Sequence, residues 1–314
     1  MASLFEIGKT GVQAYRQALS VTGQNIANIN TEGYNKRSAD INEVAGVSGG
    51  PTNVSDSSGL GVRVTNVRRS FDSYLSDKTR SSQSEYEMLN DFVSKLSDLE
   101  NMLLPSGSDL GVFIGRFFDS LQEIASNPDS ISARTVALES GKALASSFNS
   151  YDDQLKNFKS STLRQVDVKN SEANLYINQL VQVNKLIATS GSKEASNDVL
   201  DARDLLLKDL SKLFNFTVNY SDTGEAIVRL GDSGNGAYLV NRNKGAIVSS
   251  ASDGKNLSII VNNDGVKTTG IFSSGIVSGI SQFYNLVDSV SSEISKLAEQ
   301  FSNEINSIQT SGID

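Results

Sequence analysis

Residues 18–37 read ALSVTGQNIANINTEGYNKR, and the rest of the chain is interpreted outward from this stretch. Its first half continues a helical pattern that begins near residue 3, and its second half is rich in Asn, Thr and Gly. These residue types end helices and tolerate positive φ, so the second half predicts a tight turn with Gly33 in the left-handed conformation. The pattern is that of a helix entering a structured turn, and it contains no recognisable motif for bond-breaking chemistry.

The helix that leads into this turn has two apolar faces and one polar face at helical spacing. Small side chains dominate the first apolar face, which consists of Leu4, Ile7, Gly11, Ala14, Ala18 and Val21 and is continued by Asn25 and Asn28. Bulkier side chains form the second apolar face, which consists of Val12, Tyr15, Leu19, Thr22, Ile26 and Ile29. The polar face consists of Lys9, Gln13, Arg16, Ser20 and Gln24.

Two apolar faces are more than one neighbouring element can cover. The helix is therefore either the buried first helix of a bundle or a helix that is mobile in the monomer and orders against other subunits. For the second case, the candidate assembly interface comprises Leu4, Ile7, Gly11, Ala14, Tyr15, Ala18, Leu19, Val21 and Ile26.

The composition excludes several classes of function. With 314 residues, of which 38% are hydrophobic and 20% charged, the chain can bury a sizeable core as two domains or one elongated one. Its net charge of −8 argues against a general nucleic-acid binder. Because the sequence has no Cys and no His, a structural zinc site, a thiol nucleophile and a Ser-His-Asp triad are all excluded. We expect no cofactor, no bound metal and no nucleic-acid partner.

The sequence begins without a recognisable cleavable signal peptide and contains no apolar run long enough to span a bilayer. We therefore expect no membrane partner. If the chain is exported, we expect a route that leaves its N-terminus intact.

The remaining patterns predict a mainly α fold with a smaller β part. Helices are expected over residues 89–103, 110–124, 131–187, 197–214 and from about 275 onward. Short alternating runs over residues 216–271, with turns at Asp222-Thr223-Gly224 and Asn263-Asp264-Gly265, predict β-hairpins. We expect an elongated helical-bundle or coiled-coil body with this β-hairpin region inserted in it and the N-terminal helix outside it.

This organisation suggests three parts: an N-terminal assembly helix and turn over residues 1–40, a linker and extended segment over 41–79, and the core over 80–314. Residues 45–61, rich in Gly and Ser, predict a flexible loop. On the long helix, Asn170 and Asn184 fall on an apolar stripe, where they either fix the register against a neighbour or lie at a wet edge.

One acidic constellation is a candidate for chemistry. Asp198, Asp201 and Asp204 recur at three-residue spacing near the start of a predicted helix. A metal or general-acid site needs oxygen ligands that converge from more than one segment, and no second set is evident. Helix capping and pairing of Arg203 with its neighbours are the favoured interpretation.

Several segments resemble the bacterial flagellar axial proteins. Asn25-Ile26-Ala27-Asn28 followed by Asn30-Thr31-x-Gly33-Tyr34 is similar to the motif that rod, hook and hook-associated proteins share. The basic residue that follows, together with residues 67–75, 126–134, 197–207 and 294–314, resembles the hook-filament junction family most closely. The motif residues are Asn25, Asn28, Asn30, Thr31, Gly33, Tyr34, Arg68, Arg69, Phe71, Asp72, Asp201, Arg203 and Asp204.

The resemblance implies a structural subunit that is not an enzyme. Members of this family are exported through the flagellar type III pathway without a cleaved signal peptide, and they self-assemble through helices into a ring outside the cell, at the junction between hook and filament. The implied partners are the protein itself, the hook protein, the second hook-associated protein, and the export apparatus with its chaperone. The resemblance covers the N-terminal half or so of a full member, which implies an outer domain, two returning helices and the chaperone site beyond residue 314.

Three alternatives stay open at this point. The chain could be another axial protein, such as a hook, rod or second junction subunit. It could be a secreted wall hydrolase, for which Asp201, Asp204 and Glu225 are the only carboxylates to nominate. It could also be a coiled-coil translocator or adhesin that binds membranes or host surfaces.

Overall fold

The structure, a computed structural model, describes residues 4–44, 61–104, 109–190 and 195–312. The predicted loop at 45–60 and the start of the loop after residue 190 lie outside the described residues. The helices are α1 (Leu4–Ala27), α2 (Ser73–Leu103), α3 (Leu110–Ser126), α4 (Ile131–Thr189), α5 (Asn197–Leu213) and α6 (Ile276–Ser311). The strands are β1 (Arg37–Glu43), β2 (Val62–Arg69), β3 (Phe216–Tyr220), β4 (Ala226–Leu230), β5 (Tyr238–Asn241), β6 (Lys244–Gly245), β7 (Ile247–Ser252), β8 (Leu257–Asn263) and β9 (Val266–Thr269).

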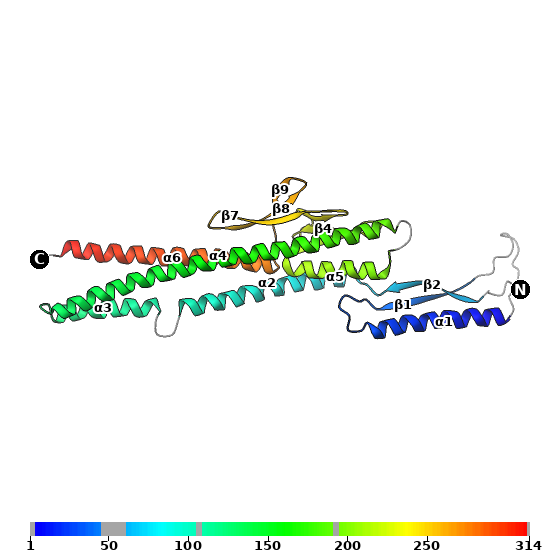
Figure 1. Cartoon of the computed structure of the whole chain (residues 1–314), viewed down its shortest axis with the longest axis horizontal. Helices are drawn as coiled ribbons and strands as arrows, with labels where there is room; N and C mark the ends of the chain where they lie inside the picture. The colour runs from blue at the N-terminus through cyan, green and yellow to red at the C-terminus, as the bar shows by residue number, and fades with distance from the viewer. Residues whose placement is uncertain (1–3, 45–60, 105–108, 191–194, 313–314) are drawn as a thin grey trace.

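The molecule is elongated, with α1 at one end and the last turns of α6 at the other (Figure 1). Helices α2 to α6 form the body, and two small antiparallel sheets lie along one side of it, beside the second half of α4. This confirms the prediction of a mainly α fold with a smaller β part. Among the described residues, no helix combines the length and the apolar character needed to cross a bilayer.

The N-terminal unit, defined as α1, β1 and β2, is a helix packed on a hairpin. Strands β1 and β2 pair antiparallel from Arg37 opposite Arg69 to Glu43 opposite Val62. Helix α1 ends in the predicted turn, where Thr31 N–H donates to the carbonyl of Asn28 at 3.0 Å. Gly33 has φ +80°, which confirms the predicted left-handed position.

The helices of the body pack around a long apolar seam. Helix α4 contacts α3, α5 and α6, which confirms that the last helix lies against the long one, and α2 packs against α6. Helix α2 begins at Ser73, earlier than the heptads indicated, because the Asp72 side chain caps it by accepting from Leu75 N–H at 3.0 Å. Leu99, Leu155 and Phe283 form one buried cluster of this seam.

A larger core lies where α4, α5 and the start of α6 meet the sheets. Leu207, Phe214 and Val228 are fully buried in it. The strand order is β3-β4-β5-β6 in one sheet and β7-β8-β9 in the other. Strands β3 to β9 all lie within the predicted β region, residues 216–271, and β6, with two residues, is too short to show a periodic pattern.

The two asparagines on the apolar stripe of α4 are buried, so neither lies at a wet edge. The Asn184 amide donates to the carbonyls of Ala226 and Arg242 at 2.8 and 2.7 Å, and its oxygen accepts from Ala226 N–H at 2.8 Å. Asn184 therefore fixes the position of α4 against strand β4 and the turn after β5, and its partners are backbone groups of the sheet. Asn170 is 3% exposed and its amide atoms have no hydrogen-bond partner among the described residues.

Candidate assembly interface

The hairpin covers one of the two apolar faces of α1. Ala14 and Val21 are buried at 3% and 6% exposure, and Ile7, Gly11 and Ala18 are half-buried. They belong to the face of small side chains, which allows the strands to approach the helix closely. Five of the nine predicted interface residues are thus at least partly buried within their own chain, although a Cβ added at Gly11 would meet open space.

The other apolar face lies in solvent. The side chains of this bulky stripe that are exposed by 60% to 79% are Val12, Tyr15, Leu19, Ile26 and Ile29. Leu4, at 88%, and Phe5, at 76%, extend the exposed surface to the start of the helix. Exposed apolar side chains along one face of a helix are typical of an interaction surface. The predicted interface residues that remain open are Leu4, Tyr15, Leu19 and Ile26.

Asn25 of the predicted motif holds α1 on the first residue of β1. Its amide donates to the carbonyl of Arg37 at 2.8 Å, and its oxygen accepts from Arg37 N–H at 2.9 Å. The Tyr34 hydroxyl donates to the same Asn25 oxygen at 2.8 Å. The Asn25 amide and the Tyr34 hydroxyl thus hold the turn and the start of β1 against the end of α1.

The other motif residues of the turn are also structural. Asn28 donates to the carbonyl of Gln24 at 2.9 Å and accepts from the Thr31 hydroxyl at 3.1 Å. Gly33 packs against Leu205 of α5, and a Cβ added there would lie 3.0 Å from the Leu205 Cβ. Asn30 is exposed.

The three aspartates of α5 meet two arginines of the hairpin. Arg37 pairs with Asp198 at 2.5 Å and with Asp201 at 3.3 Å. Arg69 pairs with Asp201 at 3.1 Å and with Asp204 at 2.6 Å. We call these five residues the ionic joint. Three-residue spacing places the aspartates on one helical face, as the sequence indicated, but that face binds the hairpin and does not cap the helix.

Four of the five side chains of the ionic joint are largely buried. The side chains of Arg69, Asp201 and Asp204 are exposed by only 8%, 10% and 8%. Burial acts to lower the pKa of Arg37, but hydrogen bonds to Asp198 and Asp201 outweigh it and hold that pKa above its usual value. The Arg37 guanidinium therefore stays charged beside the two aspartates.

Arg203 turns away from the hairpin into the body. It donates to Asp204 at 2.9 Å, which confirms the predicted pairing with a neighbour, and to the carbonyl of Gly224 at 2.6 Å. Its guanidinium also lies 4.3 Å from the centre of the Tyr220 ring. Asp204 thus links the ionic joint to the β region.

The basic-aromatic motif supplies neighbouring contacts. Arg68 pairs with Asp40 across the hairpin, and its side chain is 69% exposed. Arg69 lies over the Phe71 ring at 4.3 Å, and Asp72 caps α2. The motif therefore connects the hairpin to the first helix of the body.

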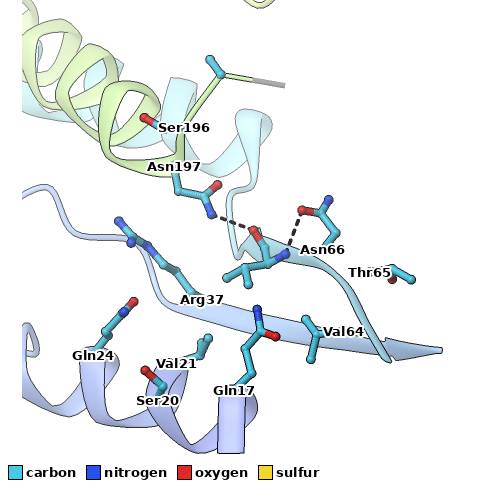
Figure 2. A pocket seen from close by; sticks show the side chains of 12 residues that line it. Gln17, Ser20, Val21, Gln24, Arg37, Val64, Thr65, Asn66, Ser196 and Asn197 are labelled. Carbon is cyan, nitrogen blue, oxygen red and sulfur yellow. Dashed lines mark hydrogen bonds between the residues drawn. The ribbon is translucent and has the colours of Figure 1, made fainter. Parts of the chain in front are cut away.

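Two open clefts flank the ionic joint. One has a volume of about 600 Å³ and lies between α1, β2 and the start of α5. Figure 2 shows its polar lining, with Gln17 and Gln24 of α1, Arg37 of β1 and Asn197 of α5 around it. The other cleft, of about 470 Å³, lies between the turn after α1 and α5.

The carboxylates nominated for hydrolysis serve structural contacts. Asp201 and Asp204 belong to the ionic joint. Glu225 lies in the β region, where it accepts from the hydroxyls of Ser221 and Thr223 at 3.1 and 2.8 Å. Among the described residues, no cluster of three or more acidic side chains could hold a metal ion.

Two family models match the chain. The model for the flagellar hook-associated protein FlgK helical domain matches residues 96–314, and that for flagella basal body rod protein matches residues 5–35. The latter match covers α1 and the following turn, and the former covers most of the body.

Curated relatives match over the whole chain or most of it. Flagellar hook-associated protein 1 of Salmonella typhimurium is 25% identical over 328 residues, covering 100% of this chain and 58% of the relative. The protein of the same name from Bacillus subtilis is 27% identical over 259 residues, covering 81% of this chain and 51% of the relative. The chain thus spans a little over half the length of these relatives.

A solved structure has a similar fold. The flagellar hook junction protein FlgK from Burkholderia pseudomallei superposes with a TM-score of 0.60 at 23% identity. The superposition covers 66% of this chain and 38% of that chain.

Proposed function

The chain belongs to the family of the flagellar hook-associated protein FlgK, whose helical-domain model matches residues 96–314, and from this premise we propose that it is a structural subunit of the junction between the flagellar hook and the filament. Its relatives from Salmonella typhimurium and Bacillus subtilis carry the name flagellar hook-associated protein 1. The proposal extends that role to this chain.

The bulky stripe of α1 is the observation that carries the proposal. The hairpin covers the face of small side chains and leaves Tyr15, Leu19 and Ile26 in solvent. Burying apolar surface contributes about 25 cal/mol per Å², so a neighbour that covers this stripe gains binding free energy. In the proposed assembly, α1 helices of adjacent copies bury the stripe and form a ring, and the polar face with Gln13 and Arg16 lines the channel.

The remaining partners follow from the proposed place of the ring. The hook protein contacts it on one side and the second hook-associated protein on the other. The chain reaches this extracellular position through the flagellar export apparatus, and the absence of Cys means that no disulfide has to be reduced before threading. We place the chaperone site in the part of the longer relatives that this chain does not match. Assembly requires no catalytic step.

Co-sedimentation with isolated hooks that lack the junction proteins tests the proposal. Leu19→Asp introduces a charge into the bulky stripe, and an unpaired charge is costly to bury. We expect it to weaken hook binding at least about tenfold, which corresponds to about 1.4 kcal/mol. Ile26→Asp should have the same effect from the other end of the stripe.

Leu186→Asp is the matched control, because Leu186 is a leucine of α4 with 57% of its surface exposed. It should bind hooks as well as the unaltered chain does. Equal hook binding by Leu19→Asp, Ile26→Asp and the unaltered chain would show that the bulky stripe is not the assembly surface.

A further inference from the structure

The connection between β4 and β5 contains the sequence Gly234-Asn235-Gly236. Asn235 is the one asparagine in the sequence that is followed by glycine. Asparagine is thermolabile because the backbone nitrogen of the next residue can attack the carbon of its side-chain amide. A side chain on that next residue hinders the attack, and glycine has none. The pair Asn235-Gly236 is therefore reactive if the fold leaves both groups free.

Both reacting groups are free in the folded chain. Asn235 is exposed, and its side-chain amide has no hydrogen-bond partner among the described residues. The N–H of Asn235 donates to the Ser233 hydroxyl at 3.4 Å, which leaves the side chain unengaged. The N–H of Gly236 donates to no group in the described part of the chain. Because residues 231–236 belong to neither a helix nor a strand, local motion can bring the amide to the nitrogen.

The two aspartates of the β region that precede a glycine are held in place by contrast. The Asp253 carboxylate accepts from the N–H groups of Lys255 and Asn256 at 2.9 and 2.6 Å. The Asp264 carboxylate pairs with Lys244 at 2.7 Å. A side chain that is held by such contacts has to break them before its carbonyl carbon can meet the next backbone nitrogen. Asn235 has no such contact to break.

We propose that Asn235 is a site of spontaneous deamidation, and that its isoaspartyl product lengthens the connection between β4 and β5. The Gly236 nitrogen forms a bond to Asn235 Cγ, the Cγ–Nδ2 bond breaks, and ammonia leaves with the proton of the Gly236 N–H. Water then opens the resulting succinimide at one of its two carbonyls. Opening at the main-chain carbonyl gives isoaspartate, whose main chain is longer by one carbon, and opening at Cγ gives aspartate. Each product carries a new carboxyl group.

The structure leaves no slack for a longer connection. The Leu230 N–H donates to the carbonyl of Ala237 at 2.9 Å, and Leu230 is 1% exposed in the core. A Cβ added at Gly236 would lie 1.8 Å from the Leu230 carbonyl oxygen. Protein interiors are close-packed, so an additional main-chain carbon beside this contact has to displace one strand end from the other. We therefore expect the isoaspartyl product to open the Leu230–Ala237 hydrogen bond.

The modification goes beyond the proposed function and does not depend on it. Both reacting groups belong to one chain, and the only co-reactant is water. Arg229 Nη1 donates to the Gly236 carbonyl at 3.4 Å, so the new carboxyl group forms close to a cation, which favours its charged form. Accumulation of the product in an ageing assembly does rest on the proposed function, because it requires that the chain be a long-lived structural subunit.

Peptide mass spectrometry of the whole folded chain, kept at pH 8 for increasing times, tests the site. The amide of Asn263 is the internal control, because it donates to the Tyr238 carbonyl at 3.0 Å and an aspartate follows it. Asn235 should turn into acid at least about tenfold faster than Asn263, since its neighbour has no side chain. The rate at Asn235 in urea should lie within about threefold of the folded rate, because the segment is already open.

Either of two results would overturn the site. Equal rates at Asn235 and Asn263 would show that the pair is not especially reactive. A folded rate far below the rate in urea would show that the fold protects it. Asn235→Gln is the matched variant, because it keeps an exposed amide but has to close a larger ring. Its gain of acid at this position should be at least about tenfold slower, since the reacting atoms are less well placed.

Hydrogen exchange tests the lengthening. In the isoaspartyl form, separated by chromatography, the Leu230 amide should exchange at least about tenfold faster than in the unmodified chain, since its hydrogen bond is opened. Asn235→Asp supplies the same charge without the additional carbon, so its Leu230 amide should keep its protection. Unchanged exchange in the isoaspartyl form would contradict the lengthening, and equal losses in both forms would assign the effect to charge. Neither measurement involves hooks, so the failure of this inference is distinguishable from that of the proposed function.

Discussion

The body carries its apolar side chains inside, with Leu155, Leu207 and Val228 fully buried, whereas α1 carries Tyr15 and Leu19 in solvent. Among the described residues of the N-terminal unit, the buried apolar side chains are those of Ala14 and Val21, which are small. Ordering a chain costs about 1–2 kcal/mol per residue in backbone entropy, and burial has to offset it. The body offsets this entropy with its own buried side chains. The N-terminal unit relies for its stability on its polar contacts and on any partner that covers the bulky stripe.

The difference fits the proposed function, which needs a body that folds by itself and an apolar surface that a neighbouring subunit can cover. The ionic joint is made by the hairpin and α5, and no residue of α1 takes part in it. Joining them through the ionic joint leaves the bulky stripe available. The comparison is sharpened by paired substitutions, one in each region.

The largest contrast is expected for leucines. Leu207→Ala removes a fully buried side chain from the core between α4, α5 and the sheets, and it should lower the free energy of unfolding by about 2–5 kcal/mol. Leu19→Ala truncates a side chain that is 72% exposed and should change it by less than about 0.5 kcal/mol. Urea unfolding of the two variants measures both values. Equal losses would mean that α1 is packed into the body in solution.

Two asparagines with similar geometry give the next contrast. Asn184 makes three hydrogen bonds to strand and turn backbone inside the body, and Asn25 makes three in the N-terminal unit. Asn184→Ala leaves buried backbone groups without hydrogen-bond partners, so it should lower the free energy of unfolding by about 1–3 kcal/mol. Asn25→Ala leaves half-buried polar groups that water can reach, so it should lower the free energy of unfolding by about 0.5–1.5 kcal/mol.

Hydrogen exchange checks where each asparagine acts. Asn25→Ala should speed exchange in α1 and β1 and leave α4 unchanged, and Asn184→Ala should do the reverse. Faster exchange of α4 amides in Asn25→Ala would show that the two regions unfold together, contrary to the comparison.

Much of the secondary structure could be predicted from the sequence. Helical spacing and a helix-breaking pair are enough to predict α4. Its apolar stripe continues from residue 144 to 187, and Asn127-Pro128 precedes the helix. Helical spacing likewise predicted two apolar faces for α1. Periodicity could not say which face the chain itself covers, because it describes the helix alone and the covering strands lie outside the helix, in β1 and β2.

The ionic joint marks the limit of prediction from sequence. The spacing of Asp198, Asp201 and Asp204 shows that they share a helical face, but Arg69 is 132 residues from Asp201 along the chain. No pattern within a short stretch of sequence links charges that are so far apart along the chain. Helix capping was the explanation that the sequence near the aspartates offered. The one available signal was the resemblance to the flagellar axial proteins. It covers the turn after α1, the end of β2 and α5, but it does not indicate that these segments meet.

Two glycines should respond to alanine with opposite sign. Gly33 has φ +80° and faces Leu205 across the interface, so Gly33→Ala should destabilise the turn by about 1–2 kcal/mol. Gly23 lies inside α1 with open space around it, so Gly23→Ala should stabilise that helix by about 0.5–1 kcal/mol. Exchange rates of the α1 amides should rise in the first variant and fall in the second. A fall in both would show that the turn needs no left-handed residue.

The smallest effect concerns Asp91, a half-buried carboxylate of the body. Burial raises the pKa of Asp91 on α2 above its ordinary value, although Lys95 and Lys169 act to lower it. The folded state therefore holds the proton more tightly than the unfolded chain does. The stability that the protonated form contributes is complete below about pH 3.9 and is lost as the pH rises through the folded-state pKa. Above that pKa the charged carboxylate is a constant cost.

Asp91→Asn removes that cost, so the variant should be more stable than the unaltered chain at pH 7, by less than about 1 kcal/mol. The advantage should shrink as the pH falls towards 4, because the unaltered side chain then becomes neutral as well. Urea unfolding at both pH values measures the difference, with Asp98→Asn on the exposed side of α2 as the control. A variant that is less stable at pH 7 would mean that Lys95 and Lys169 compensate the charge of Asp91 fully.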